Sequence, residues 1–542
     1  MKKLSNEELL AEFDELHRLR CANLASHRAA RRLTLPYVSL SMLSRRELLR
    51  FAAVSWISAL RSSTGFTLPA WALSRSATVG KPKISALRKS FIGEIICPDN
   101  SAYDAARIIA SFNLFTDRYP QIIARCADER DIVRAIQFSR EHALEVAVRA
   151  GGFDVLGAST CDGMVIDLSH LKQIVVNRQV ATARVQAGVR SAELSSAAEA
   201  QGLVAALGCH PSIGITGLTL GGGLGWLAGK CGASCDNVIR ANVVTADGKV
   251  LEASANKNSD LFWAIKGGGG NFGVISQLEL RLHPLDQVFG GAAAYRSDFA
   301  AFLRFYRDFM KEAPAELTVE INIRQLGKPT LLATACWSGN PAEAEGVLRP
   351  LREFGPPVAD AMRVVSLNHL IDRPGPDFGR RLFGDGITPP PAAVPKGGRW
   401  HDYWRGGSLE QLSDQAAAQI ASALSDAPQG WSIGLGHYFH GRVSQISHLE
   451  SCLPRKAGQL TYFFDVGWWD PALAEAAMGW VNKCYAAMQP YSSSATYINY
   501  LSSNNLTDVR ASYGENYGKL AALKRKYDPY NFFHLNRNIV PA

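Results

Sequence analysis

No run of apolar side chains in the 542 residues approaches the roughly 20 that a membrane-spanning helix needs. Paired Cys-x-x-Cys knuckles are absent too, and the closest cysteine pair, Cys231 and Cys235, has no matching His/Cys pair at zinc spacing. The other cysteines are scattered, so a disulfide framework is not expected, although one bridge could form in an exported protein. We therefore expect no stable membrane insertion and no metal site.

Excess positive charge is concentrated near the N-terminus. The net charge is +9, and much of the excess precedes residue 90, from Arg18 and Arg20 to Lys81 and Lys83. A basic leader explains this distribution better than a nucleic-acid-binding face, which would gather basic residues on one side of a folded domain. We expect no nucleic-acid partner.

The leader, assigned to residues 1–90, has the pattern of an export signal. Arg45 and Arg46 precede a short apolar run at 51–60, and Ala70-Trp71-Ala72 is typical of a cleavage site. The adjacent arginines resemble a twin-arginine signal, which exports folded proteins. The expected location is periplasmic or secreted, with Met42 as an alternative start. An uncleaved leader on a cytoplasmic protein is the other interpretation.

Glycine marks the region where chemistry is expected. Apolar residues at helical spacing in 128–142 and a buried strand at 145–148 lead into a loop with Gly151, Gly152 and Gly157. This loop matches neither the Rossmann nor the P-loop signature. Its backbone can still approach a diphosphate closely, with successive N–H groups forming an anion nest. Two more glycine clusters lie at 208–226 and 266–275, and three such loops exceed what turns alone require.

Several blocks, in order, resemble one known family. They are Val165-Ile166-Asp167-Leu168-Ser169, Val243-Val244-Thr245-Ala246-Asp247-Gly248 and the stretch from Asp260 to Gly269, followed near the C-terminus by Tyr513-Gly514-Glu515-Asn516-Tyr517 and the stretch from Phe532 to Ile539. Together they resemble the p-cresol methylhydroxylase and vanillyl-alcohol oxidase superfamily, with the berberine-bridge-enzyme-like branch fitting best. The resemblance covers the chain from about Pro98 to its end, weakly through the middle.

The resemblance implies an α+β fold. A PCMH-type FAD-binding domain of two subdomains would span 98–284, an antiparallel-sheet substrate domain 285–495, and a berberine-bridge-like closing segment 496–542. The implied protein is an FAD-dependent oxidoreductase that oxidises a small organic substrate, such as an alcohol, a sugar or a secondary metabolite, by hydride transfer to flavin N5. The implied FAD contacts are Arg149, Ala150, Gly151, Gly152, Phe153, Asp154, Gly157, Ala158, Ser159, Gly208, Ile213, Gly214, Thr216, Gly217, Gly222, Ile275 and Asn536.

Two positions depart from the family pattern. Members with a covalently bound flavin carry a histidine after the Gly-Gly pair, where this chain has Phe153, which has no nucleophilic atom. Doubly tethered members carry a cysteine just before the proline of the second loop, where this chain has His210, with Cys209 one residue early. A one-residue shift at strand geometry turns a side chain the other way. We therefore expect non-covalent FAD, with His210 as an improvised tether the alternative.

The catalytic residue implied by the resemblance is Tyr500. Tyr497-Ile498-Asn499-Tyr500 resembles the branch's Tyr-x-Asn-Tyr block, whose second tyrosine serves as base toward the substrate hydroxyl. A phenol with a pKa of about 10 is a poor base unless a neighbour lowers that pKa, so Tyr500 as a mere aromatic wall is the alternative. Strand-like segments carry four further candidates for the cavity, of whose two histidines only one is expected to face the flavin: His437, Tyr438, His440 and Tyr462.

The electron acceptor is expected to be oxygen or another molecule. In the branch, the residue three before Thr216 lies beside the flavin edge, where valine accompanies oxidases and bulkier side chains accompany dehydrogenases. This chain has Ile213, one methylene larger than valine, which favours slow reaction with oxygen. The alternatives to an oxidase are therefore a dehydrogenase with a different acceptor and a flavin-binding protein without turnover.

Overall fold

A computed structural model describes residues 79–110, 116–296, 298–371 and 400–542 of the chain. The expected export signal and its cleavage site lie outside these residues. Contacts group Ser76–Ala542 into one compact unit. No helix in the described ranges is long and apolar enough to span a bilayer.

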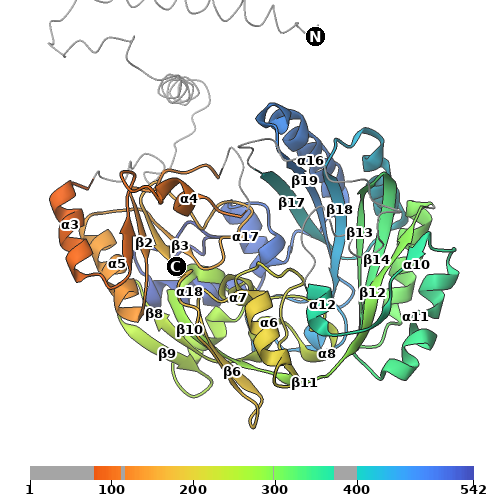
Figure 1. Cartoon of the computed structure of the whole chain (residues 1–542), viewed down its shortest axis with the longest axis horizontal. Helices are drawn as coiled ribbons and strands as arrows, with labels where there is room; N and C mark the ends of the chain where they lie inside the picture. The colour runs from red at the N-terminus through yellow and green to blue at the C-terminus, as the bar shows by residue number, and fades with distance from the viewer. Residues whose placement is uncertain (1–78, 111–115, 297, 372–399) are drawn as a thin grey trace, which may run out of the picture. The chain divides into compact units, whose positions relative to one another are not determined.

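The first sheet lies at the N-terminal end of this unit (Figure 1). Its order is β1 (Glu94–Ile96), β2 (Ile122–Arg125), β4 (Met164–Asp167) and β3 (Val146–Arg149), with β2, β4 and β3 parallel and β1 antiparallel. Apolar residues of α3 (Lys81–Ser90) and α5 (Glu129–Glu141) cover one face, and α4 (Tyr103–Arg107) packs on the other. Asp128 caps α5 by accepting hydrogen bonds from the Arg130 and Asp131 N–H groups. The predicted helix at 128–142 and strand at 145–148 are confirmed.

The second sheet is antiparallel and follows directly along the chain. Its order is β5 (Ile174–Asn177), β6 (Thr182–Gln186), β10 (Val274–Arg281), β8 (Val238–Val244) and β9 (Val250–Ser254). Helices α6 (Ser191–Glu199), α7 (Ile215–Leu220) and α9 (Ser259–Ile265) bury apolar residues against it. The short helix α8 (Ala228–Cys231) and the strand pair β7 (Leu203–Val204) and β11 (His283–Pro284) lead toward the third sheet.

The third sheet is antiparallel and, within the described residues, has eight strands. Along its main path lie β15 (Ala359–Asp360), β12 (Val288–Tyr295), β14 (Lys328–Trp337), β13 (Leu317–Leu326), β18 (Trp431–Tyr438), β19 (Leu460–Trp468) and β17 (His401–Leu409), and β16 (Arg363–Val365) pairs with β12. Helices α10 (Phe299–Lys311), α11 (Ala344–Glu353), α14 (Asp414–Ser422) and α16 (Ala474–Met488) cover one face, while α12 (Leu367–Ile371) and α15 (Arg442–Gln445) join it to the second sheet's helices.

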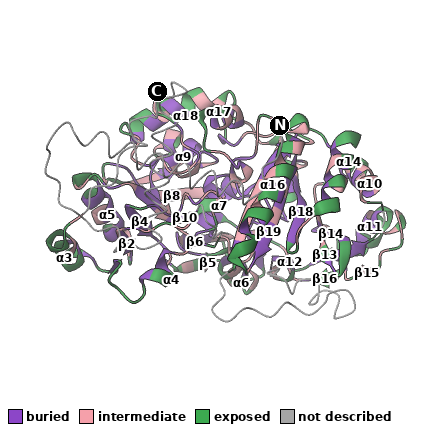
Figure 2. Ribbon diagram, turned by 90° about the horizontal axis from the view of Figure 1, so that it is seen from above, coloured by how far each residue is buried: buried purple, intermediate pink, exposed green. Residues whose placement is uncertain are grey.

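Alternation along β13 decides which face of the third sheet is the core. Val319, Ile321 and Ile323 are buried among the helices, so the residues between them face the opposite way. Figure 2 shows the strands largely buried and the outer surface of α16 exposed. The face away from the helices is therefore available to line a site.

The C-terminal segment returns to the second sheet through η10 (Ile498–Tyr500), α17 (Leu506–Tyr513) and α18 (Asn516–Tyr527). Lys524 fastens it there: its Nζ is fully buried and donates to Asp528 Oδ2 at 2.7 Å, to the Asn271 carbonyl at 2.7 Å and to the Phe533 carbonyl at 2.8 Å. A buried ammonium is tolerated because all three of its donors are satisfied. Lys524 thus ties the third glycine loop to the chain's last residues.

The expected α+β architecture is confirmed, with two sheets bearing the glycine loops and a third, antiparallel sheet beside them. The domain boundaries at 98, 284 and 495 stay a prediction, because everything from Ser76 to Ala542 forms one compact unit. Helix α3 falls inside the stretch assigned to the leader, yet its Leu87 is buried in the first core. None of the cysteines in the described ranges takes part in a disulfide.

Candidate active site

A cavity of about 1120 Å³ lies between the glycine loops and the third sheet. Its walls come from the loops after β3, around α7 and before β10, from the strands β13, β14, β17, β18 and β19, and from residues near Tyr500 and Asn536. Segments far apart in the sequence therefore meet at one site. This volume slightly exceeds the roughly 300–1,000 Å³ typical of ligand pockets.

Two glycine loops touch backbone to backbone at the base of this cavity. A Cβ on Gly151 would lie 2.4 Å from the Gly214 nitrogen, and one on Gly214 would lie 2.5 Å from the Gly151 nitrogen. Real Cβ atoms do not approach that closely, so both positions require glycine. The loop after β3 and the loop before α7 are held together by this contact.

Asp154 organises the first loop from within. Its Oδ1 accepts hydrogen bonds from the Leu156 and Ala158 N–H groups at 2.9 and 3.0 Å, and its Oδ2 accepts one from Arg537. Burial opposes ionisation of the carboxyl, but Arg537 and these N–H groups outweigh burial and lower the pKa of Asp154. The expected cofactor contact is thus also the anchor that joins the loop to the C-terminal segment.

Buried polar atoms beside this loop fit an anionic group. Arg149 donates from Nη1 to the Ala106 carbonyl, but its Nε and Nη2 have no hydrogen-bond partner, and neither do Ser159 Oγ and Asn536 Oδ1. Burial lowers the pKa of the Arg149 guanidinium, which shows the cost of holding that charge away from water. The Ser159 hydroxyl beside the glycine cradle can donate to a dinucleotide diphosphate, and the Arg149 guanidinium behind the loop adds positive charge. The residues present therefore fit FAD.

Most of the expected FAD contacts line the cavity. They are Ala150, Gly151, Gly152, Phe153, Asp154, Ala158, Ser159, Gly208, Ile213, Gly214, Thr216, Gly217, Ile275 and Asn536. Arg149, Gly157 and Gly222 lie outside the lining and support it from behind. Gly157 has a φ of +76° and packs on Thr116, while Gly222 has a φ of +121° and packs on Tyr497 and Leu453. Both glycines shape the loops rather than face the cavity.

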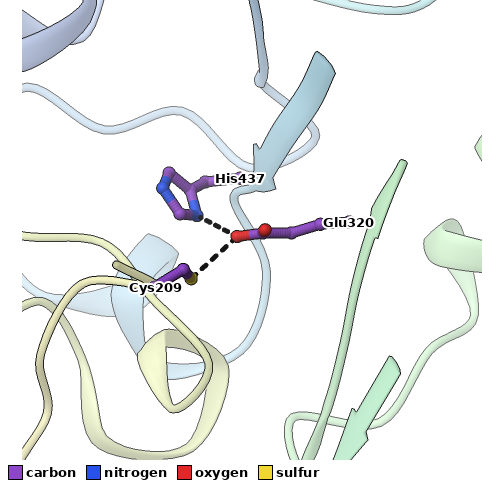
Figure 3. Close-up of side chains that lie close together, drawn as sticks. All are labelled: Cys209, Glu320 and His437. Carbon is purple, nitrogen blue, oxygen red and sulfur yellow. Dashed lines mark hydrogen bonds and ion pairs between the residues drawn. The ribbon is translucent and has the colours of Figure 1, made fainter. Parts of the chain in front are cut away.

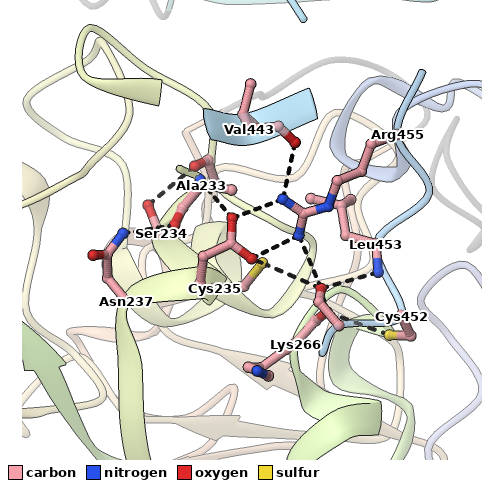
Figure 4. A network of polar contacts seen from close by, with 12 residues as sticks. Ala233, Ser234, Cys235, Asn237, Lys266, Val443, Cys452, Leu453 and Arg455 are labelled. Atoms are coloured by element: carbon pink, nitrogen blue, oxygen red, sulfur yellow. Dashed lines mark hydrogen bonds and ion pairs between the residues drawn. The ribbon is translucent and has the colours of Figure 1, made fainter. Parts of the chain in front are cut away.

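An ion pair fastens the turn behind the second glycine cluster to the loop between α15 and β19. Arg455 donates from Nη1 and Nη2 to the two carboxylate oxygens of Asp236, at 2.8 and 2.6 Å, and from Nη2 to Ser451 Oγ at 3.0 Å. Figure 4 shows Arg455 beside Val443 and Cys235 in this network. In the turn that carries Asp236, the N–H groups of Ser234 and Cys235 donate hydrogen bonds to the carbonyls of Gly223 and Gly222. Because this Arg–carboxylate pair is bidentate and almost fully buried, it fixes orientation as well as distance.

The cavity face of the third sheet carries polar and aromatic side chains in cross-strand rows. Arg324 of β13 pairs in register with Ser432 of β18, Ser432 with Asp465 of β19, and Asp465 with Trp404 of β17. The sequence-based candidates include none of the residues of this row. One signal for Arg324 is present in the sequence, because polar residues alternate with apolar ones along β13: Thr318, Glu320, Asn322 and Arg324.

Asp402 and Asp465 form a carboxyl pair in this wall. Burial raises the pKa of both groups, and their mutual repulsion raises that of Asp402 further. Two carboxylates in contact cannot both stay ionised, so the pair shares a proton. The pair can therefore both donate and accept hydrogen bonds toward a ligand.

Tyr500 faces the cavity, whereas the hydroxyl of Tyr497 is hydrogen-bonded to the loops behind it. The Tyr497 hydroxyl accepts hydrogen bonds from the Gly223 N–H at 2.8 Å and from Asn499 Nδ2 at 2.9 Å, which fixes it to the second glycine cluster. The Tyr500 ring lies between Trp404 and His437, with centroids 5.1 and 5.8 Å away. Gly436 makes room for it, because a Cβ there would lie 3.0 Å from the Tyr500 oxygen.

Burial sets the protonation of Tyr500. Desolvation raises its pKa well above the usual value, and Glu320 and Cys209 raise it further. The phenol is therefore protonated in this arrangement, and any role as a base requires new neighbours when cofactor and substrate fill the cavity. His437 also lines the cavity, and burial lowers the pKa of its imidazole despite the opposing effect of Glu320.

The remaining sequence candidates lie elsewhere. Tyr462 is buried in the helix-covered core, with its hydroxyl 2.6 Å from Ser492 Oγ, and Tyr438 packs against the same core. His440 borders Gly229, outside the cavity lining. Of the two histidines only His437 lines the cavity, and His440 lies beyond the end of β18; which of them faces the flavin stays a prediction.

Both tether positions of the family meet at the cavity. The Phe153 ring lies 5.0 Å from the His210 ring, centroid to centroid, and His210 Nδ1 lies 2.9 Å from Ser212 Oγ. The Cys209 thiol turns to the third sheet and donates to Glu320 Oε1 at 2.9 Å. The Cys209 sulfur, one residue before the family's tether position, is therefore hydrogen-bonded to β13.

Comparisons with known proteins agree with this geometry. Residues 120–254 match the model of the FAD binding domain, and residues 496–540 match the model named berberine and berberine like. (R)-6-hydroxynicotine oxidase of Paenarthrobacter nicotinovorans is 28% identical over 83% of this chain and 97% of its own length. The carbohydrate oxidase of Microdochium nivale is 26% identical over 89% of this chain and 100% of its own length.

Solved structures give the same result. 6-Hydroxy-D-nicotine oxidase from Arthrobacter nicotinovorans superposes with a TM-score of 0.72 at 26% identity, over 83% of this chain and 98% of that one. A berberine bridge enzyme variant superposes with a TM-score of 0.73 at 22% identity, over 86% of this chain and 100% of that one, and supports the fold. The chain is therefore an FAD-linked oxidoreductase, similar in its FAD-binding domain and its closing segment to the berberine-bridge-enzyme-like branch of the p-cresol methylhydroxylase and vanillyl-alcohol oxidase superfamily.

Proposed function

We propose that this oxidoreductase binds FAD without a covalent bond and oxidises a hydroxyl-bearing small molecule held between the flavin and the third sheet. The observation that carries the proposal is one cavity, walled by the glycine loops on one side and by Tyr500, His437 and the polar row of β13, β18, β19 and β17 on the other. Relatives named for hydroxynicotine and carbohydrate oxidation are consistent with such a substrate.

Different parts of the cavity would bind the cofactor and the substrate. The loops around Gly151 and Gly214 would hold the FAD diphosphate, with Arg149 supplying positive charge behind them. When bound, FAD supplies the redox chemistry by taking up a hydride at N5. The protonated Tyr500 phenol would hydrogen-bond the substrate hydroxyl, and it would accept that hydroxyl's proton only after its own proton has passed to solvent, which requires bound cofactor and substrate to lower its pKa. The Asp402–Asp465 pair and Trp404 would orient the remainder of the substrate.

The first prediction tests Tyr500 and the proposed activity together. Mixing the yellow protein anaerobically with a panel of alcohols, sugars and phenolics should bleach the flavin with at least one class. Tyr500→Phe should keep FAD yet slow that reduction by about 10²-fold or more, because acid–base assistance is lost. Tyr462→Phe is the matched control, since its hydroxyl lies in the helix-covered core, and it should reduce at the native rate.

Other outcomes of this experiment have separate meanings. No bleaching by any substrate would favour a flavin-binding protein without turnover. Normal reduction of Tyr500→Phe would assign the base to His437, because burial favours the neutral form of its imidazole.

Readmitting air to the reduced protein distinguishes oxygen from other electron acceptors. We propose slow reoxidation of the native protein, because Ile213 lines the cavity, and faster reoxidation of Ile213→Val.

The second prediction concerns the flavin linkage. Acid precipitation should leave FAD in the supernatant, because Phe153 offers no nucleophile and Cys209 is turned to Glu320. Flavin fluorescence that stays with the denatured polypeptide would contradict the proposal. His210→Ala identifies the alternative tether: it should change nothing in a non-covalent protein and should abolish retention if His210 forms the bond.

We also propose export by the twin-arginine route, supported by Arg45-Arg46 and the short apolar run behind them. A reporter fused after Ala72 should reach the periplasm, and Arg45→Lys with Arg46→Lys should block that export. The neighbouring pair Arg31→Lys with Arg32→Lys is the matched control and should leave export intact. Equal export of all three fusions would remove the support for this route.

A further inference from the structure

Three side chains with metal-binding atoms converge where the second glycine cluster meets the third sheet. Cys209 comes from the loop before α7, Glu320 from β13 and His437 from β18, and Figure 3 shows them pointing toward one another. The Sγ, carboxylate oxygen and imidazole nitrogen all lie within 4.8 Å of one another. All three residues line the cavity.

The Nδ1 atom of the His437 imidazole is buried and has no hydrogen-bond partner among the described residues. The His437 side chain is 10% exposed, and Glu320 Oε1 lies 3.4 Å from this nitrogen. That contact is an ion pair only if the imidazole is protonated, which burial opposes. A buried nitrogen 3.4 Å from a carboxylate oxygen, without a hydrogen bond, is a geometry that a cation bound by both atoms would satisfy.

The spacing suits a tetrahedral cation. Bonds of about 2.3 Å to sulfur, about 2.05 Å to nitrogen and about 2.1 Å to oxygen place N and O about 3.4 Å apart, and S and O about 3.6 Å apart. The nitrogen–oxygen distance here is 3.4 Å, and the sulfur–oxygen distance is 2.9 Å. The nitrogen–oxygen pair already has the required spacing, and the thiol has to rotate away from the oxygen to which it now donates.

We infer that Cys209, Glu320 and His437 form a binding site for one divalent cation of borderline softness, with Zn²⁺ the best match. One thiolate, one imidazole and one carboxylate are a zinc ligand set, and three protein ligands leave the fourth position open. That position opens on the cavity, where a water or a ligand oxygen would complete the coordination. Binding converts the Cys209 thiol to a thiolate and releases its proton to solvent.

The site shares the cavity with the proposed oxidation, because Cys209, Glu320, His437 and Tyr500 all line it. Cation binding is measured without turnover, so the inference stands whether or not a substrate is found. Sequence spacing gave no sign of it, since 111 residues separate Cys209 from Glu320 and His437 lies on a third strand. Only the fold brings the ligands together.

The test uses the purified flavoprotein after chelator treatment and dialysis. Titration with Co²⁺ should produce tetrahedral d–d bands at wavelengths beyond the flavin absorption, saturating at one ion per chain, and Zn²⁺ should abolish them. Zn²⁺ addition in weakly buffered solution should release one proton per ion bound. Cys209→Ser and Glu320→Gln should each lose stoichiometric binding and the bands. Cys484→Ser removes a buried thiol of the helix-covered core and should behave as the native protein.

FAD content and circular dichroism confirm that each variant is folded. Should Cys209→Ser lose its FAD, His437→Gln leaves the loop intact and carries the same prediction. Absence of stoichiometric Zn²⁺ and Co²⁺ binding to the native flavoprotein would overturn the inference, and the trio would then be a hydrogen-bonded cluster. Binding that survives both Cys209→Ser and His437→Gln would overturn it as well, because the ion would be held elsewhere.

Discussion

The contact between the backbones of Gly151 and Gly214 is the constraint on which the site depends. It brings together two loops that belong to different sheets, and neither position tolerates a Cβ. Everything that the cavity offers an anion follows from that approach: the exposed N–H groups of the loop after β3, the start of α7, and the buried guanidinium of Arg149 behind them. Asp154 then attaches the C-terminal segment to the first of these loops, and Lys524 attaches it to the third glycine loop, so the end of the chain closes the site that its first third begins.

The third sheet completes the cavity by simple alternation. Its strands give their apolar residues to the helix-covered core and their remaining residues to the cavity, so one sheet supplies both stability and a chemically varied wall. That wall changes character along its length. Arg324, Ser432 and the Asp402–Asp465 pair occupy one end, and Glu320 and His437 occupy the other, beside Tyr500 and Cys209. A substrate would therefore meet hydrogen-bonding groups away from Tyr500 and titratable groups near it.

Local patterns predicted the parts of this structure that depend on local physics. The α5 helix and the β3 strand follow from apolar spacing and from Asp128 as a cap. The glycine loops indicate a backbone that closely approaches a ligand or another loop. Pairings across the fold had no such signal. Asp154 and Arg537 are 383 residues apart, and nothing near either residue indicates the other. Sequence also could not tell a glycine that faces the cavity from one that supports it, which is why Gly157 and Gly222 were grouped with the contacts. Tyr462 is an aromatic strand residue like those in the wall, and only its register places it in the core.

Calorimetric titration of FAD into the apoprotein is the measurement that tests the central claim most directly, namely that the Gly151–Gly214 contact builds the cofactor site. Gly214→Ala would force a Cβ to within 2.5 Å of the Gly151 nitrogen, whereas Gly479→Ala on α16 meets nothing within 4 Å. The account predicts that Gly214→Ala loses FAD affinity by at least tenfold while its sheets remain folded, and that Gly479→Ala binds FAD like the native protein. Undiminished FAD binding by Gly214→Ala would contradict it.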